Sequence, residues 1–337
     1  MAELRAAALV GCGMISVYHL RAWENAGVPI VAVCDTDRAR AQARADEFRV
    51  ARVYDDPAAL FAEGGFDAVD IAASLPAHDP VTRMAADHGV HVVLQKPMTR
   101  TVAEAEALVA HVGERVRFMV HENYRFRPHY MQVRRWLDEG RIGRVRHATM
   151  SVRGSGLCAL EGEEPFLLRR QPYLREFDRN LVFETMIHHL DVLRLLCGPL
   201  TVVAARLNRL ADGLPGEDTA TILMEGEGGL VASADGCLVA PGYPQLHGDR
   251  LELVGTKATV VMDYDRVFLV GREEDAVTVD LLGRYQECFD TATAAFVRGV
   301  REDTPFETDR LYNLETLRLM ESVYRAAGIV PEPEARP

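Results

Sequence analysis

Two lysines, Lys96 and Lys257, are present among the 38 lysine and arginine residues of this 337-residue chain. Lys96 lies in the stretch HVVLQKPMTR, between a β-like apolar run and Pro97. An ammonium is a compact charge with a tunable pKa, whereas a guanidinium is broad and permanently charged. An exposed lysine at a strand end would be the simpler interpretation in a lysine-rich protein. Here the scarcity of lysine favours a chemical role for Lys96.

A second polar group lies in NLVFETMIHHLDVLRLLCGP, residues 180–199, which reads as a helix ended by Gly-Pro. Glu184, His188 and Asp191 follow i, i+4, i+7 spacing, so they are expected on one face. The opposite face is expected to be core and carries Met186, Leu190, Leu193 and Cys197. A polar stripe of this kind is typical of a solvated face. A histidine in it also suits a proton acceptor, because its ordinary pKa is near neutrality.

A glycine turn follows the first apolar run, as Gly11-x-Gly13-x-x-Ser16 at the start of a helical pattern. The first glycine permits a tight turn, and the second lets the backbone approach a pyrophosphate at the helix N-terminus. Asp35 ends the next strand-like run, 22 residues after Gly13. An acid there accepts hydrogen bonds from ribose hydroxyls and repels a 2′-phosphate, so NAD is favoured over NADP.

Each of these signals has a simpler interpretation. The glycines alone would be consistent with an ordinary turn, and Asp35 with a cap for the helix that starts near Asp37. Arg38 is expected to flank the adenine, which leaves NADP open as the alternative cofactor. The combination of strand, glycine turn, helix and acid indicates dinucleotide binding.

The first third of the chain alternates continuous apolar runs with amphipathic helical patterns, which predicts a parallel sheet covered on both faces. The expected strands are residues 5–11, 29–35, 51–54, 66–74, 91–95 and 115–123. After a helical connector at 128–140, alternating patterns predict a largely antiparallel sheet, followed by two closing helices. The expected fold is α/β: a Rossmann domain (1–123), then an α+β domain with a large, mostly antiparallel open-faced sheet (124–330), then a frayed tail (331–337).

The composition argues against several classes of binding partner and against a metal site. A net charge of −12 argues against nucleic acid or an anionic membrane. The six cysteines form neither a C-x-x-C motif nor a dense framework, which favours reduced thiols, a cytoplasmic location and no structural metal. A metal site is not expected from the adjacent His188 and His189, because neighbouring helical side chains point in different directions.

The chain resembles the Gfo/Idh/MocA family of oxidoreductases over nearly its whole length. The resemblance rests on the glycine turn and on PAHDPVTRMAADHGVHVVLQKP, ENYRFRPHY, ETMIHHLD, LELVGTKATV and FETDRLYNLETLRLMESVYRAA. In that family a Glu-Lys-Pro motif follows strand five, and its lysine lies beside the nicotinamide and the reacting hydroxyl. This chain has Gln95-Lys96-Pro97, which removes one negative charge from the motif.

The resemblance implies roles for further residues. The family pattern Asp-x-Gly-x-His-x-x-Asp is represented by Glu184, Met186, His188 and Asp191, so the acid is longer and the glycine is missing. The expected catalytic residues are Lys96, His188 and Glu184. The expected cofactor-binding residues are Gly11, Gly13, Met14, Ile15, Asp35, Arg38, Ser74, Leu75, His78, Gln95, Lys96 and Asn123. The expected substrate-binding residues are His121, Arg125, Arg169, Tyr173, Glu184 and His188.

Several of these assignments have alternatives. His78 matches a family histidine near the cofactor but is also placed to cap the following helix. Arg125 is expected to line a cleft between the two domains. An interdomain ion pair is the alternative for Arg125 and Arg127. Arg169 and Tyr173 belong to segment 167–177, a candidate specificity loop because polyols need several directional hydrogen-bonding groups. Its surroundings resemble relatives that oxidise aldoses.

The expected function is NAD-dependent hydride transfer at a carbinol or carbonyl carbon of a sugar, cyclitol or related polyol. His188 is expected to accept the hydroxyl proton, and Lys96 to stabilise charge on the same oxygen. The expected assembly is a homodimer or homotetramer formed through the open sheet. Two alternatives stay open: a redox-neutral, NAD-dependent glycosidase, and a regulatory protein that senses the dinucleotide.

Overall fold

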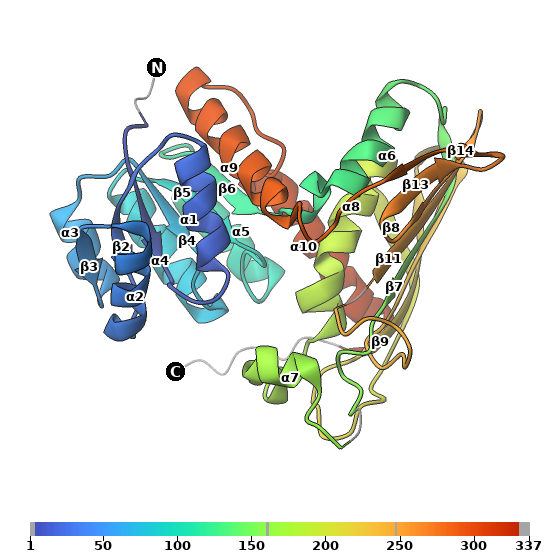
Figure 1. Ribbon diagram of the computed structural model, residues 1–337, viewed down its shortest axis with the longest axis horizontal. Helices are drawn as coiled ribbons and strands as arrows, with labels where there is room; N and C mark the ends of the chain where they lie inside the picture. The colour runs from blue at the N-terminus through green and yellow to red at the C-terminus, as the bar shows by residue number, and fades with distance from the viewer. Residues whose placement is uncertain (1–3, 160–161, 247, 330–337) are drawn as a thin grey trace. The chain divides into compact units, whose positions relative to one another are not determined.

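The computed structural model describes residues 4–159, 162–246 and 248–329 (Figure 1). The described residues divide into two compact units, one of residues 4–126 with Gly283–Leu317 and one of Arg127–Leu282 with residues 318–329. The first break therefore falls at Phe126 rather than at residue 123, and residues 283–317 group with the amino-terminal unit. The expected tail, 331–337, lies outside the described residues.

The first unit is built on a six-stranded sheet in the order β3-β2-β1-β4-β5-β6. Every neighbouring pair is parallel. The strands are β1 (Ala7–Val10), β2 (Ile30–Cys34), β3 (Arg52–Tyr54), β4 (Ala68–Ile71), β5 (His91–Gln95) and β6 (Phe118–His121). The central strands are fully buried and continuously apolar apart from Asp70. This is the doubly wound Rossmann sheet that the sequence predicts.

A helix lies between each pair of successive strands: α1 (Ser16–Asn25), α2 (Arg38–Phe48), α3 (Pro57–Glu63), α4 (Leu75–Asp87) and α5 (Val102–Val112). The unit also contains the short η1 (Tyr124–Phe126) and, from the later segment, α9 (Tyr285–Glu302). Local chemistry sets their starts. Asp56 accepts from the Ala58 N–H before α3, and Thr101 and Glu104 form a reciprocal capping box on α5.

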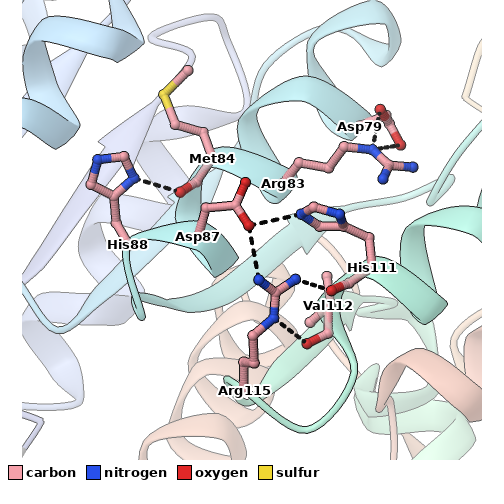
Figure 2. Close-up of polar contacts among 8 residues, drawn as sticks. All are labelled: Asp79, Arg83, Met84, Asp87, His88, His111, Val112 and Arg115. Atoms are coloured by element: carbon pink, nitrogen blue, oxygen red, sulfur yellow. Dashed lines mark hydrogen bonds and ion pairs between the residues drawn. The ribbon is translucent and has the colours of Figure 1, made fainter.

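Helices α4 and α5 are joined at the surface by an acid that bridges a histidine and an arginine (Figure 2). Asp87 Oδ1 lies 2.9 Å from both His111 Nε2 and Arg115 Nη1. Desolvation alone would raise the pKa of the Asp87 carboxyl, but these hydrogen bonds lower it below its ordinary value. Exposed pairs of this kind contribute little to stability, so this cluster mainly orients the helix ends.

The second unit is built on an eight-stranded sheet in the order β14-β13-β12-β11-β7-β10-β9-β8. Its strands are β7 (Val145–Arg153), β8 (Leu200–Asn208), β9 (Thr219–Gly226), β10 (Leu230–Cys237), β11 (Gly248–Gly255), β12 (Thr259–Asp263), β13 (Arg266–Leu269) and β14 (Arg272–Thr278). Within the part of this sheet that the structure describes, only β7 and β10 pair in parallel. The prediction of a large, mostly antiparallel sheet is confirmed.

One face of this sheet packs against α6 (Pro128–Asp138) and α8 (Ile187–Cys197) (Figure 1). The other helical segments are α7 (Phe166–Arg170), η2 (Pro172–Arg175), η3 (Leu181–Met186), η4 (Glu227–Gly229) and α10 (Arg310–Ala326), whose residues are divided between the two units. Among the described residues, no helix is both long and apolar enough to cross a membrane.

The expectation of one regular helix over 180–199 is wrong at its start. Residues Leu181–Met186 form a π-helix, and the α-helix begins only at Ile187. His188 and Asp191 thus share a face of α8, whereas Glu184 lies in the preceding π-turn rather than one α-turn before His188. The predicted end is confirmed, because α8 stops at Cys197 and Gly198 adopts a positive φ of 84°.

Candidate active site

The glycine turn after β1 has the backbone that its sequence predicts. Gly11 has a φ of +95°, and a Cβ added there would lie 2.4 Å from the backbone nitrogen of Ala73. Only glycine fits this close approach of two strand ends. A Cβ on Gly13 would instead meet no atom within 4 Å. Gly13 therefore leaves open space beside the N-terminus of α1, whose first turn contains no acidic residue.

Asp35 ties the glycine turn to the end of β2. Its Oδ2 accepts from the Cys12 N–H at 2.8 Å, and its Oδ1 accepts from the Asp37 N–H at 2.9 Å. The alternative interpretation of Asp35 as the cap of α2 is wrong, because the Asp37 side chain accepts from the first amides of that helix. Arg38 pairs with Asp55 at 3.4 Å at the surface. A carboxylate held at this strand end fits the ribose of a dinucleotide.

The predicted cofactor residues on the turns after β1 and β4 differ in exposure. Met14 is 53% exposed, while Ile15 packs against the buried cluster beneath the turn that includes Leu20. Ser74, at the N-cap of α4, is exposed and makes no side-chain cap, and Leu75 begins that helix half-buried. The exposed positions, the open space at Gly13 and the fixed Asp35 together fit a dinucleotide.

Lys96 directly follows β5, and the residues on both sides of it make hydrogen bonds. Its backbone N–H donates to Gln95 Oε1 at 2.7 Å. One residue later, the carbonyl oxygen of Pro97 lies 2.8 Å from His78 Nδ1, and His78 Nε2 lies 3.1 Å from the Ala73 oxygen. The His78 ring therefore joins the segments that follow β4 and β5. Parallel-sheet ligands bind at this carboxyl edge.

A buried polar group beneath this edge was not predicted. His19 Nδ1 lies 2.9 Å from Asp70 Oδ2, and Trp23 Nε1 donates to the same oxygen at 2.7 Å. His19 Nε2 lies 3.1 Å from Gln95 Nε2. The side chains of His19 and Asp70 are fully buried. Burial alone would raise the pKa of Asp70, but His19 and Trp23 hold it below its ordinary value.

Two predicted residues at the end of β6, His121 and Asn123, are also buried. His121 is fully buried, with its ring 4.4 Å from that of His19 and 5.2 Å from that of Phe289. Asn123 Nδ2 donates to Cys288 Sγ at 3.2 Å. The predicted substrate contact of His121 and cofactor contact of Asn123 stay predictions.

Arg125 is buried within the first unit. Its guanidinium lies 4.4 Å from the centre of the Tyr312 ring and 3.6 Å from Glu307 Oε2. Arg127, in contrast, pairs with Asp249 of the second unit at 3.6 Å. Each of these ion pairs lies within one unit. The predicted contact of Arg125 with substrate stays a prediction.

In the second unit the structure brings Glu184 and Tyr173 together. Burial of the hydroxyl raises the pKa of Tyr173, and the neighbouring Glu184 carboxylate raises it further. The residue as a whole is 48% exposed. Gln171 Nε2 donates to the Tyr173 hydroxyl at 3.1 Å. Arg169 pairs with Glu163 at 3.4 Å at the surface. An acid, a phenol and an amide in contact form a group suited to hydroxyl-rich ligands.

Helix α8 is buried on the polar face as well as on the apolar one. His188 is 7% exposed and Asp191 is fully buried, so the solvated-face alternative is wrong. His189 Nε2 lies 3.0 Å from Asp249 Oδ1, and the Tyr130 hydroxyl donates to Asp249 Oδ2 at 2.9 Å. His189 thus links α8 to β11 and fixes the helix that carries His188.

The π-turn that carries Glu184 is anchored by a second buried acid. Glu217 accepts from the N–H groups of Asn180 at 3.2 Å and Val182 at 2.9 Å, and from the Tyr324 hydroxyl at 2.7 Å. Burial raises the pKa of Glu217, and these hydrogen bonds oppose the shift. The carboxylate satisfies amides that the first turn of any helix leaves unbonded. No pattern in the sequence indicated that Glu217 or Asp249 would anchor these segments.

No group of three His, Cys, Asp or Glu side chains suited to a metal occurs in the described ranges. Comparison with known proteins shows two matched regions. Residues 5–123 match the oxidoreductase family with an NAD-binding Rossmann fold, and residues 130–261 match the Gfo/Idh/MocA C-terminal domain.

Individual relatives agree with this match. D-apiose dehydrogenase of Rhizobium rhizogenes is 37% identical over 263 residues, 77% of this chain and 73% of that protein. Inositol 2-dehydrogenase 2 of Saccharopolyspora erythraea is 29% identical over 303 residues, 86% of this chain and 83% of that protein. An Agrobacterium radiobacter oxidoreductase, crystallised with NAD+, L-tartaric acid and magnesium, has a TM-score of 0.88 at 29% identity and covers 97% of both chains. The protein therefore belongs to the Gfo/Idh/MocA family of NAD-binding oxidoreductases.

Proposed function

We propose that the protein is an NAD-dependent dehydrogenase that oxidises a carbinol of a small sugar, with a D-apiose-like aldose as the first candidate and cyclitols as the second. The observation that carries the proposal is the 37% identity to D-apiose dehydrogenase over 77% of the chain. The contact of Glu184 with Tyr173 supports a hydroxyl-rich substrate, because polyols need several directional hydrogen bonds.

The residues proposed to hold the cofactor surround the first turn and the carboxyl edge of the Rossmann sheet. Gly11 and Gly13 let the pyrophosphate approach α1, and Asp35 accepts from the ribose. The Asp35 carboxylate would repel the 2′-phosphate of NADP, which favours NAD. When bound, NAD accepts a hydride from the carbinol carbon of the substrate.

Lys96 is proposed to donate a hydrogen bond from Nζ to the reacting oxygen and to stabilise its developing negative charge. An ammonium suits this task because it is a compact donor with three protons. The bonds made by Gln95 and Pro97 fix the backbone on both sides of Lys96, so the side chain starts from a defined position.

His188 is proposed to accept the hydroxyl proton, and Glu184 to hold a substrate hydroxyl or orient the base. The anchor from His189 to Asp249 holds α8, and Glu217 holds the π-turn. Proton transfer by a positioned side chain contributes about 10²–10⁴-fold to a rate.

The test combines a substrate panel with a matched pair of lysine variants. The wild-type enzyme should accumulate NADH with an aldose or cyclitol, and Lys96→Met should lower kcat by about 10²–10³-fold. Lys257→Met is the control, since Lys257 Nζ donates to the Gly140 carbonyl at 2.9 Å, at the surface of the second unit. Full activity of Lys96→Met would reject the role of Lys96.

The same panel separates the two alternatives. Cleavage of a glycoside without net NADH would indicate a redox-neutral glycosidase. Tight NADH binding without turnover across aldoses, cyclitols and their oxidised forms would indicate a dinucleotide-sensing protein.

A homo-oligomer formed through the open sheet is also part of the proposal. Apolar side chains are exposed on three adjacent strands of that sheet, with Val203 53%, Leu223 40% and Val231 44% exposed. All six cysteines are free thiols, which supports the reducing conditions of a cytoplasm. Light scattering of wild type and Leu223→Arg tests the assembly: a smaller particle is expected for the variant, and an unchanged mass would reject this interface.

A further inference from the structure

The amide of Gln95 is oriented by its neighbours. Its Oε1 accepts from the Lys96 backbone N–H at 2.7 Å, a contact that the amide nitrogen could not make. Gln95 Nε2 therefore faces His19 Nε2, at 3.1 Å. An amide nitrogen only donates, so His19 Nε2 must be the acceptor.

The orientation of Gln95 in turn sets the tautomer of His19. With Nε2 accepting, the ring proton is on Nδ1, which donates to Asp70 Oδ2 at 2.9 Å. Trp23 Nε1 donates to the same carboxylate oxygen at 2.7 Å. The chain of hydrogen bonds thus runs from Gln95 through a neutral His19 to an ionised Asp70, and it contains one net negative charge.

We propose that His19 and Gln95 are positioning residues for Lys96: a neutral His19, held by Asp70, fixes the Gln95 amide, which fixes the backbone of the catalytic lysine. This inference rests on the proposed role of Lys96. It also explains why an amide, rather than the acid of the family motif, stands before the lysine. A carboxylate could not donate to His19 Nε2, so an acid at this position would require one additional proton in the chain.

The surroundings limit where that proton could go. The titratable groups that face His19 in the described structure are Asp70 from β4 and His121 from β6, whose ring lies 4.4 Å away. Helix α9 presents the uncharged ring of Phe289, at 5.3 Å. A Gln95→Glu variant should therefore bind its extra proton on His19, which would bridge two carboxylates. When pH rises and this proton leaves, the introduced carboxylate faces the His19 lone pair and the anchor of Lys96 is lost.

The first experiment reads the proton directly. Nitrogen-15 spectra of the histidine rings in the full chain should show wild-type His19 protonated on Nδ1 alone, and doubly protonated in Gln95→Glu. Protonation of Nε2 in the wild type would overturn the inference, and so would an extra proton on His121 instead of His19 in the variant. This readout does not depend on turnover.

The second experiment reads the consequence for Lys96. Gln95→Glu should acquire an additional ionisation in its kcat–pH profile, with turnover falling as pH rises through it. Gln95→Met, which cannot form either bond, should lower kcat by about 10- to 100-fold at all pH values without that ionisation. The KM for the sugar should stay close to wild type, whereas the melting temperature should fall, because the buried His19 Nε2 loses its donor. Gln42→Glu, an equal charge change at an exposed position on α2, is the control and should leave the profile unchanged.

The outcomes separate the two proposals. If Lys96→Met is inactive and Gln95→Met has the kcat of the wild type, the positioning inference fails and the role of Lys96 stands. If Lys96→Met is fully active, the proposed role of Lys96 fails and the positioning inference fails with it, whereas the absence of NADH formation with every sugar would count against the proposed function itself.

Discussion

Replacing Gly13 by alanine should separate cofactor binding from folding. A Cβ at Gly13 would meet no protein atom within 4 Å, and its φ is not positive. The substitution should therefore leave the free energy of unfolding unchanged or raise it by up to about 1 kcal/mol, because alanine restricts the unfolded chain. In the complex, the added methyl would occupy the space through which the pyrophosphate approaches the backbone.

The cost to binding follows from overpacking. One extra methyl in a filled site costs about 1–3 kcal/mol, which corresponds to a dissociation constant for NADH that is about 5- to 150-fold larger. Gly11→Ala is the contrasting variant. Its Cβ would lie 2.4 Å from the Ala73 nitrogen at a φ of +95°, so strain and overpacking together should destabilise the fold by about 2–5 kcal/mol.

Fluorescence titration with NADH and denaturant unfolding of both variants provide the two readouts. Gly13→Ala should lose affinity at wild-type stability, and Gly11→Ala should lose stability. Unchanged NADH affinity in Gly13→Ala would refute the reasoning, since it would mean that the dinucleotide does not approach this backbone.

Two further predictions concern the second unit. Burial, with a smaller effect of Arg127, lowers the pKa of His129 from 6.5 to about 3, so the unfolded chain binds a proton that the folded chain excludes. Stability should therefore fall as pH decreases from 6.5 toward 3, by about 2 kcal/mol between pH 7 and pH 5, and His129→Phe should remove this part of the dependence in denaturant titrations. Asp249→Ala should destabilise the unit by about 3–5 kcal/mol, because it removes the buried carboxylate that His189 and a tyrosine hydroxyl contact. Asp263→Ala, at the partly exposed end of the neighbouring strand β12, should change the free energy of unfolding by less than about 0.5 kcal/mol; equal effects of the two variants would contradict the anchoring role.

The parts of the fold that sequence predicts well are those with local periodicity. Each strand of the Rossmann sheet lies within its predicted run, and the 91–95 prediction matches β5 at both ends. The glycine turn and the position of Asp35 could be predicted because their chemistry depends on residues close in sequence. The π-turn at Leu181–Met186 was not, since its apolar positions are equally compatible with an α-helix.

The polar anchors could not be predicted because they join distant segments. His19 and Asp70 are 51 residues apart and meet only because α1 packs on the sheet beside β4. Glu217 reaches amides 35 and 37 residues earlier in the chain. A lone acid in an apolar strand, as at Asp70, is the one signal that could have indicated a buried partner.

The central claim is that a substrate carbinol is oxidised by NAD on this protein. The most direct measurement uses D-apiose, other aldoses and inositols deuterated at the carbinol carbon, with mass analysis of the recovered nucleotide. The proposed function predicts deuterium in NADH in equal amount to oxidised sugar, and loss of this transfer in Lys96→Met. Turnover of the sugar without deuterium in the nucleotide would contradict it.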